Sequence, residues 1–242
     1  SRGRPLAALR RIGLAGVIGG IGLVFAFAGA ISAIQTTTIA NAVFLFTASP
    51  FVAALLGWII LGERVKPWTW AAIALAVFGM YLMVREGLAI GALQGNIAAL
   101  LSAAGFGAFS VALRWGRVAD MLPVSMLGGV FSILVAGAVL AMQGQPISAS
   151  TWDMGIALGI GALILALGMV MYTLGSRVIP AAELTLLSLI EVLMAPIWVF
   201  LFLGETASSA TFVGGGVLLA AVALNAVIGA RAQMVEGVAE RP

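Results

Sequence analysis

The chain has 242 residues, of which 62% are hydrophobic and 9% are charged, whereas soluble domains carry about 25% charged residues. Cysteine and histidine are both absent, which excludes disulfides and chemistry that depends on a thiolate or an imidazole. The net charge of +3 comes from basic residues spread along segment ends, without the shared basic face of a nucleic-acid-binding protein. The composition therefore predicts a membrane protein.

Eight apolar segments follow one another along the chain, each of a length that lets a helix cross the bilayer. Short connectors containing Thr, Gly, Gln or Pro separate them. The predicted spans are residues 12–34, 39–61, 68–84, 94–115, 121–142, 152–176, 180–203 and 207–229. The expected fold is an all-α polytopic membrane protein with eight transmembrane helices, followed by a polar tail.

The basic residues predict the orientation of these spans, because Lys and Arg near span ends are retained in the cytoplasm. When the loops are assigned alternately to two faces, Arg85 is the only basic residue on one face and the remaining eleven lie on the other. We expect the eleven-residue face to be cytoplasmic and to hold both ends of this chain, including residues 231–242. The expected location is a cell membrane, in a bacterium the inner membrane.

A Leu-Gly-Glu signature closes two of the predicted spans, at residues 61–63 and again 142 residues later at residues 203–205. Five apolar segments lie between the copies, so the copies fall on opposite faces of the membrane. This pattern predicts an inverted-topology repeat, the architecture in which secondary transporters form a substrate site near the bilayer midplane. The first repeat is expected at residues 1–86 and the second at residues 87–230.

The same offset leaves the spans at 94–115 and 121–142 without partners, since their counterparts would lie before residue 1. We therefore expect two further helices in the parent protein, which gives it ten.

The motifs of the two repeats resemble the EamA family of the drug/metabolite transporter superfamily. The matching residues are Thr37 to Ala42, Ser49-Pro50-Phe51 and Leu61 to Arg64 in the first repeat, and Ile179 to Glu183, Glu191 and Leu203-Gly204-Glu205 in the second. The family commonly has proline after the glutamate, but this chain has Glu191-Val192. The resemblance implies a ten-helix exporter of small metabolites that works by alternating access around a central cavity.

Glu191 is the first candidate for a substrate or proton site. It lies eleven residues beyond Pro180, which places it about 16 Å into a hydrocarbon core of about 30 Å. A carboxylate at that depth is costly and by default marks a transport pathway. The structural alternative is a hydrogen bond between helices.

The other candidate substrate contacts are polar or aromatic side chains within spans. Ser188 lies one helical turn before Glu191, and Ser49 is the repeat counterpart of Glu191 beside Pro50, which should bend its helix. The remaining candidates are Asn41, Phe46, Tyr172 and Trp198. Helix packing or capping is the alternative for each of them. Glu63 is expected to be structural, paired with Arg64, Lys66 or a neighbouring loop.

The predicted function is that of a secondary-type transporter exporting an amino acid or a related amphipathic metabolite. The alternatives are a channel, a non-transporting membrane scaffold, or a carrier of lipid-linked or nucleotide sugars. An enzyme is not expected, because no nucleophile stands with a base. The expected partners are a small-molecule substrate and the lipid bilayer, without nucleic acid, metal or cofactor. Protons as the coupling ion and a homo-oligomeric state are left open.

Overall fold

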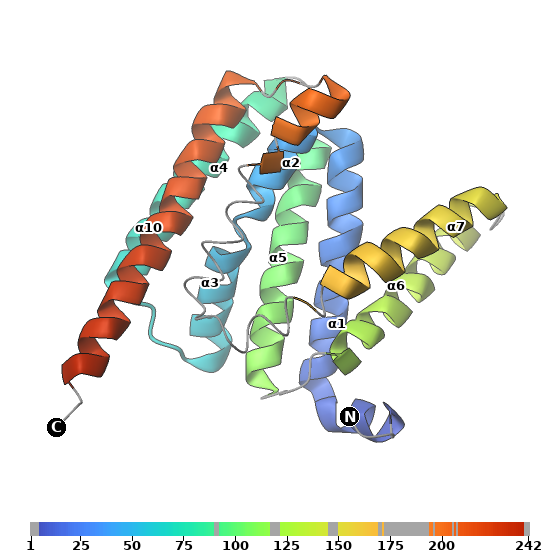
Figure 1. Cartoon of the computed structure of the whole chain (residues 1–242), viewed down its shortest axis with the longest axis horizontal. Helices are drawn as coiled ribbons and strands as arrows, with labels where there is room; N and C mark the ends of the chain where they lie inside the picture. The colour runs from blue at the N-terminus through green and yellow to red at the C-terminus, as the bar shows by residue number, and fades with distance from the viewer. Residues whose placement is uncertain are drawn as a thin grey trace.

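The computed structural model describes residues 5–89, 92–116, 122–144, 150–168, 171, 194–195, 197–204, 206 and 208–239. All regular structure in these residues is helical, and Figure 1 shows most of the long helices side by side in a bundle. Six described helices are long and apolar enough to cross a membrane. The expectation of an all-α polytopic membrane protein is confirmed.

The described helices follow the predicted order of spans. They are α1 (Pro5–Thr36), α2 (Ile39–Phe46), α3 (Ser49–Leu61), α4 (Pro67–Ala89), α5 (Leu93–Trp115), α6 (Leu122–Met142), α7 (Thr151–Gly159), the π-helix η1 (Ile160–Ala166) and α10 (Ser209–Ala239). The membrane-crossing part of α1 begins at Gly13, where a φ of 56° interrupts the helix. The span predicted at 152–176 is represented by an apolar helix over Thr151–Leu165, and most of the span predicted at 180–203 lies outside the described residues.

The second span is a broken helix. Thr47 and Ala48 separate α2 from α3, and their backbone N–H groups donate to carbonyls three residues earlier. Pro50 follows in the first turn of α3, a position where the missing N–H of proline costs no helical hydrogen bond. The interruption therefore lies two residues before the proline that predicts a bend.

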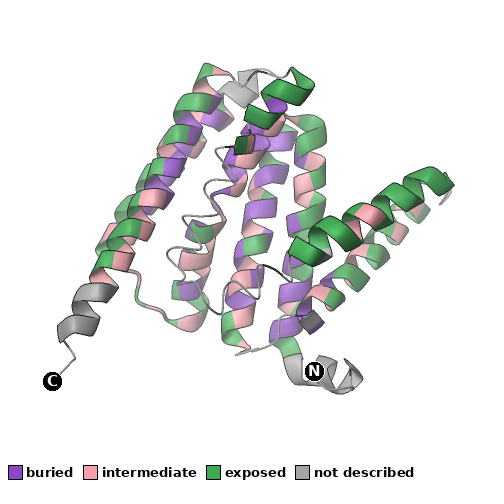
Figure 2. Ribbon diagram, in the orientation of Figure 1, coloured by how far each residue is buried: buried purple, intermediate pink, exposed green. Residues whose placement is uncertain are grey.

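Helix α5 lies at the centre of the bundle. More than half of its membrane span is buried (56%), compared with 11–33% in the other five, and Figure 2 shows its buried residues along most of its length. It packs closely on α1 through glycine, since a Cβ on Gly105 would lie 2.5 Å from the carbonyl oxygen of Gly22. Small residues allow such close approach of membrane helices.

Helices α4 and α10 form a contact that agrees with the inverted repeat. A Cβ on Gly79 would lie 2.6 Å from the Gly214 carbonyl oxygen, and a Cβ on Gly214 would lie 2.5 Å from that of Gly79. The 142-residue offset relates Gly79 to Ala221 and Gly214 to Ala72. Both alanines are buried in one core cluster, which α4 and α10 form together with Phe51 of α3. The offset thus relates two residue pairs of one interface, as the predicted inverted repeat leads us to expect.

Candidate functional site

A buried cluster of amide and hydroxyl side chains lies where α1 ends and α2, α5 and α10 begin. We call Thr37, Asn41, Asn96 and Thr211 the asparagine cluster. Nδ2 of Asn41 donates to Oδ1 of Asn96 and, over 3.1 Å, to Oγ1 of Thr37. The Thr37 hydroxyl reaches the same Asn96 oxygen at 3.4 Å, and the Thr211 hydroxyl reaches Oδ1 of Asn41 at 3.5 Å. The cluster therefore joins four helix ends.

The cluster is shielded from its surroundings. Asn96 is fully buried, and Asn41 and Thr211 are each 4% exposed. Nδ2 of Asn96 has no hydrogen-bond partner in the part of the chain that the structure describes. A buried amide without a partner costs about 1–3 kcal/mol, so the cluster is a polar group that the fold retains at a cost.

Local sequence explains how the helix ends meet at this cluster. Thr38 caps α2, because its hydroxyl accepts from the backbone N–H of Asn41 at 3.3 Å. Ser208 caps the start of α10 in the same way, accepting from the N–H of Thr211 at 3.1 Å. Gly95 lets α5 approach the link between α1 and α2, since a Cβ there would lie 2.7 Å from the backbone nitrogen of Thr37.

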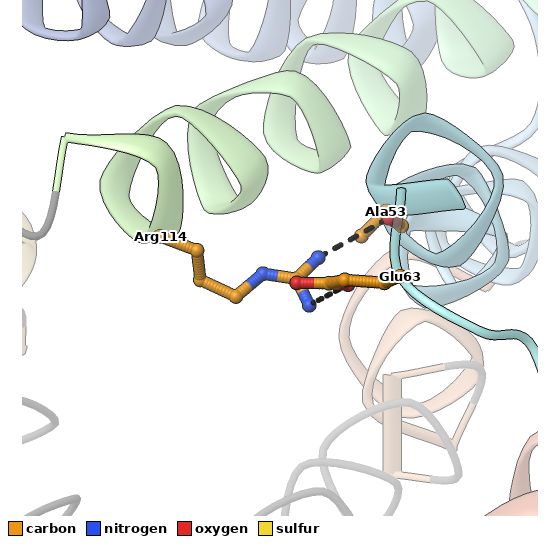
Figure 3. Close-up of polar contacts among 3 residues, drawn as sticks. All are labelled: Ala53, Glu63 and Arg114. Atoms are coloured by element: carbon orange, nitrogen blue, oxygen red, sulfur yellow. Dashed lines mark hydrogen bonds and ion pairs between the residues drawn. The ribbon is translucent and has the colours of Figure 1, made fainter. Parts of the chain in front are cut away.

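An ion pair joins α3 to α5 at the opposite end of α5, as Figure 3 shows. Nη1 of Arg114 lies 2.8 Å from Oε2 of Glu63, and Nη2 donates to the carbonyl oxygen of Ala53 over 3.2 Å. Both charged side chains are partly exposed, Arg114 by 46% and Glu63 by 41%. Glu63 thus pairs with Arg114, at the end of a neighbouring span, and not only with the residues that follow it in its own connector.

The Leu-Gly-Glu turn positions Glu63 for this pair. Gly62 has a left-handed conformation (φ 66°), and the backbone N–H groups of Gly62 and Glu63 both donate to the carbonyl of Gly57. A left-handed glycine is a common helix terminator. Gly204, in the second copy, has the same φ of 66°. The signature therefore marks a helix end in both copies.

The predicted substrate contacts fall into three groups in the structure. Asn41 belongs to the asparagine cluster, while Phe46 and Ser49 are half-buried and flank the break between α2 and α3. Trp198 is 53% exposed and stacks on Phe202 with ring centroids 5.7 Å apart. Tyr172, Ser188 and Glu191 lie outside the described residues, so their roles stay predictions.

Asn96 and Thr211 are the members of the cluster that sequence reasoning missed. The signal for Asn96 is an amide at the start of an otherwise apolar segment, directly after a glycine and two residues after Gln94. The 142-residue offset gives it no partner in this chain, so the repeat comparison passed over it. Among the described residues, no group of three or more metal-binding side chains occurs.

Comparison with known proteins identifies the family of this chain. The sequence matches the EamA-like transporter family over residues 2–85 and 93–227. This chain belongs to that family. An uncharacterized transporter from Archaeoglobus fulgidus is 30% identical over 195 residues, which are 79% of this chain and 68% of the relative. A protein known from a crystal structure is similar in fold, with 22% identity and a TM-score of 0.52 over 94% of this chain and 83% of the other. The chain is thus a multi-pass membrane protein of the drug/metabolite transporter type.

Proposed function

We propose that this chain belongs to a secondary transporter that exports a small amphipathic metabolite, such as an amino acid, by alternating access. The observation that carries the proposal is the broken second span, where Thr47 and Ala48 interrupt an apolar helix between α2 and α3. Interrupted backbone at membrane depth is tolerated where it is buried in protein or lines a cavity. Discontinuous helices of this kind form the central sites of many secondary transporters.

The proposed transport pathway runs past the interruption between α2 and α3 and continues towards the second repeat. Phe46 supplies an apolar surface and Ser49 a hydroxyl, which suits a cargo with both apolar and polar parts. Glu191, Ser188, Tyr172 and Trp198 are proposed to complete the substrate site from the second repeat, with protons or exchanged substrate as the driving force. Asn41 lies in the first turn of α2, at the proposed non-cytoplasmic mouth.

Reconstitution of the full-length protein into liposomes tests this function against its alternatives. We expect saturable uptake of a metabolite pool, accelerated when unlabelled metabolite is present on the other side of the membrane. Ion conductance that does not saturate would favour a channel. Neither flux nor conductance, with the protein folded in the bilayer, would favour a scaffold.

A further inference from the structure

Helix α5 is tied at both of its ends to helices of the predicted first repeat. At its beginning Asn96 bonds to Asn41 of α2, and in its last turn Arg114 bonds to Glu63 and to the backbone of α3. Eighteen residues separate Asn96 from Arg114, about 27 Å along a helix. If the repeats rock against each other, opening one side of the membrane requires one of these two links to part.

The two links differ in how easily they part. The asparagine cluster is buried, so separating it leaves amides without partners in a medium of low dielectric constant. The Glu63–Arg114 pair is more than two-fifths exposed on both sides, and water and salt take over the solvation of such pairs when they break. The link at the end of α5 that carries Arg114 is therefore the weaker one.

The weaker of the two links lies on the side at which an exporter must open first. An exporter must open towards the cytoplasm to load its cargo, and it must stay closed on the other side until it is loaded. The positive-inside rule assigns the end with Arg114 to the cytoplasm. Resting on the proposed function, we propose that Glu63 and Arg114 form a cytoplasmic latch that opens in the empty protein while the asparagine cluster keeps the opposite side closed.

The chemistry of Arg114 suits a latch between two helices. Its planar guanidinium donates to the Glu63 carboxylate and to the Ala53 carbonyl at the same time, which the single ammonium of lysine does not reproduce. Deeper in the same contact, a Cβ on Gly107 of α5 would lie 3.0 Å from Cβ of Val52. Val52 is only partly exposed in this contact, so its accessibility should increase when α3 and α5 separate behind the latch.

Thiol labelling tests the latch without knowledge of the cargo. The chain contains no cysteine, so Val52→Cys provides the one thiol of this chain, and any cysteine elsewhere in the full-length protein is replaced by serine. A membrane-impermeant maleimide is applied to either side in oriented vesicles. We expect Arg114→Gln to accelerate labelling from the cytoplasmic side by about two- to fivefold, the range that an exposed ion pair can supply. Arg114→Lys should give an intermediate rate.

Two further variants distinguish faster labelling caused by misfolding from faster labelling caused by loss of the latch. The double variant Glu63→Arg, Arg114→Glu restores the pair with reversed charges and should return labelling to the original rate. Asn41→Ala, in the same reporter background, should raise labelling from the outside and not from the cytoplasm. Unchanged labelling in Arg114→Gln, equal acceleration from both sides, or failure of the charge reversal to restore the rate would each overturn the latch.

The labelling and transport measurements distinguish failure of the latch proposal from failure of the proposed transport function. Export with no change in reporter labelling would remove the latch and leave the transport function in place. The expected labelling changes without any metabolite flux would support the conformational switch and remove the function.

Discussion

At the scale of single residues, the asparagine cluster shows how a membrane protein uses a few polar groups to fix the positions of helix ends. Asn41 is placed by its cap Thr38 and bonds to side chains from α5 and α10. In an apolar interior, amides that must find each other specify one arrangement of the helices. Asn96, whose Nδ2 has no hydrogen-bond partner among the described residues, is the residue at which this arrangement is costly.

Removing the Asn41 side chain should therefore destabilise the protein. Asn41→Ala leaves Asn96 with fewer partners, and we expect a loss of about 1–3 kcal/mol in unfolding free energy. Thermal unfolding of the purified protein in detergent measures this. Ser110→Ala is the matched control, because the Ser110 hydroxyl bonds to the carbonyl of Phe106 in its own helix, and it should change stability by less than about 0.5 kcal/mol. Equal loss in both variants would contradict the role of the cluster.

Glu191 carries the proposal for the substrate or proton site. Glu191→Gln keeps the shape of the side chain and removes its charge, so we expect a reduced export rate and a flattened dependence on pH. The measurement is export across a pH series in cells with matched protein levels. Rates and a pH profile equal to those of the unmodified protein would end this role for Glu191.

At the scale of helices, the sequence predicts where apolar segments cross the membrane but not which side chains meet between them. The span ends follow from apolar length and from connectors with Gly and Pro. Six predicted spans agree with the structure at both ends within about three residues. The partner of Glu63 and the importance of Asn96 depend on which faces of α2, α3 and α5 touch. Those faces are set by tertiary packing, and a helix that is apolar all round gives no signal for them.

The close backbone contact between α1 and α5 predicts that a larger residue at Gly105 will destabilise the protein. Gly105→Ala places a methyl group against the Gly22 carbonyl, where no flexible side chain can move aside, and should cost about 1–3 kcal/mol of unfolding free energy. Gly129→Ala is the control within α6, since a Cβ there meets nothing within 4 Å. It should be neutral or stabilising by up to about 1 kcal/mol. Equal thermal stability of the two variants would argue against the tight α1–α5 contact.

At the scale of the whole molecule, the two Leu-Gly-Glu turns and the α4–α10 contact both obey the same 142-residue offset. Inverted repeats place equivalent turns on opposite faces of the membrane.

The orientation of the molecule is tested by single cysteines in its connectors. Arg64→Cys lies in the predicted cytoplasmic connector after α3, and Gln143→Cys lies in the predicted outer connector after α6. An impermeant thiol reagent applied to whole cells should label Gln143→Cys only, and both variants should react after the membrane is permeabilised. Labelling of Arg64→Cys in intact cells would reverse the orientation and the direction proposed for the latch.

Export itself is the central claim, and the metabolite profile of the medium tests it most directly. Cells expressing the full-length protein are compared with cells expressing Glu191→Gln at the same membrane level. We predict that one small amphipathic metabolite, or a small group of them, accumulates outside the cells that express the unmodified protein and falls in the variant. Identical profiles in the two cultures and in cells without the protein would contradict the account.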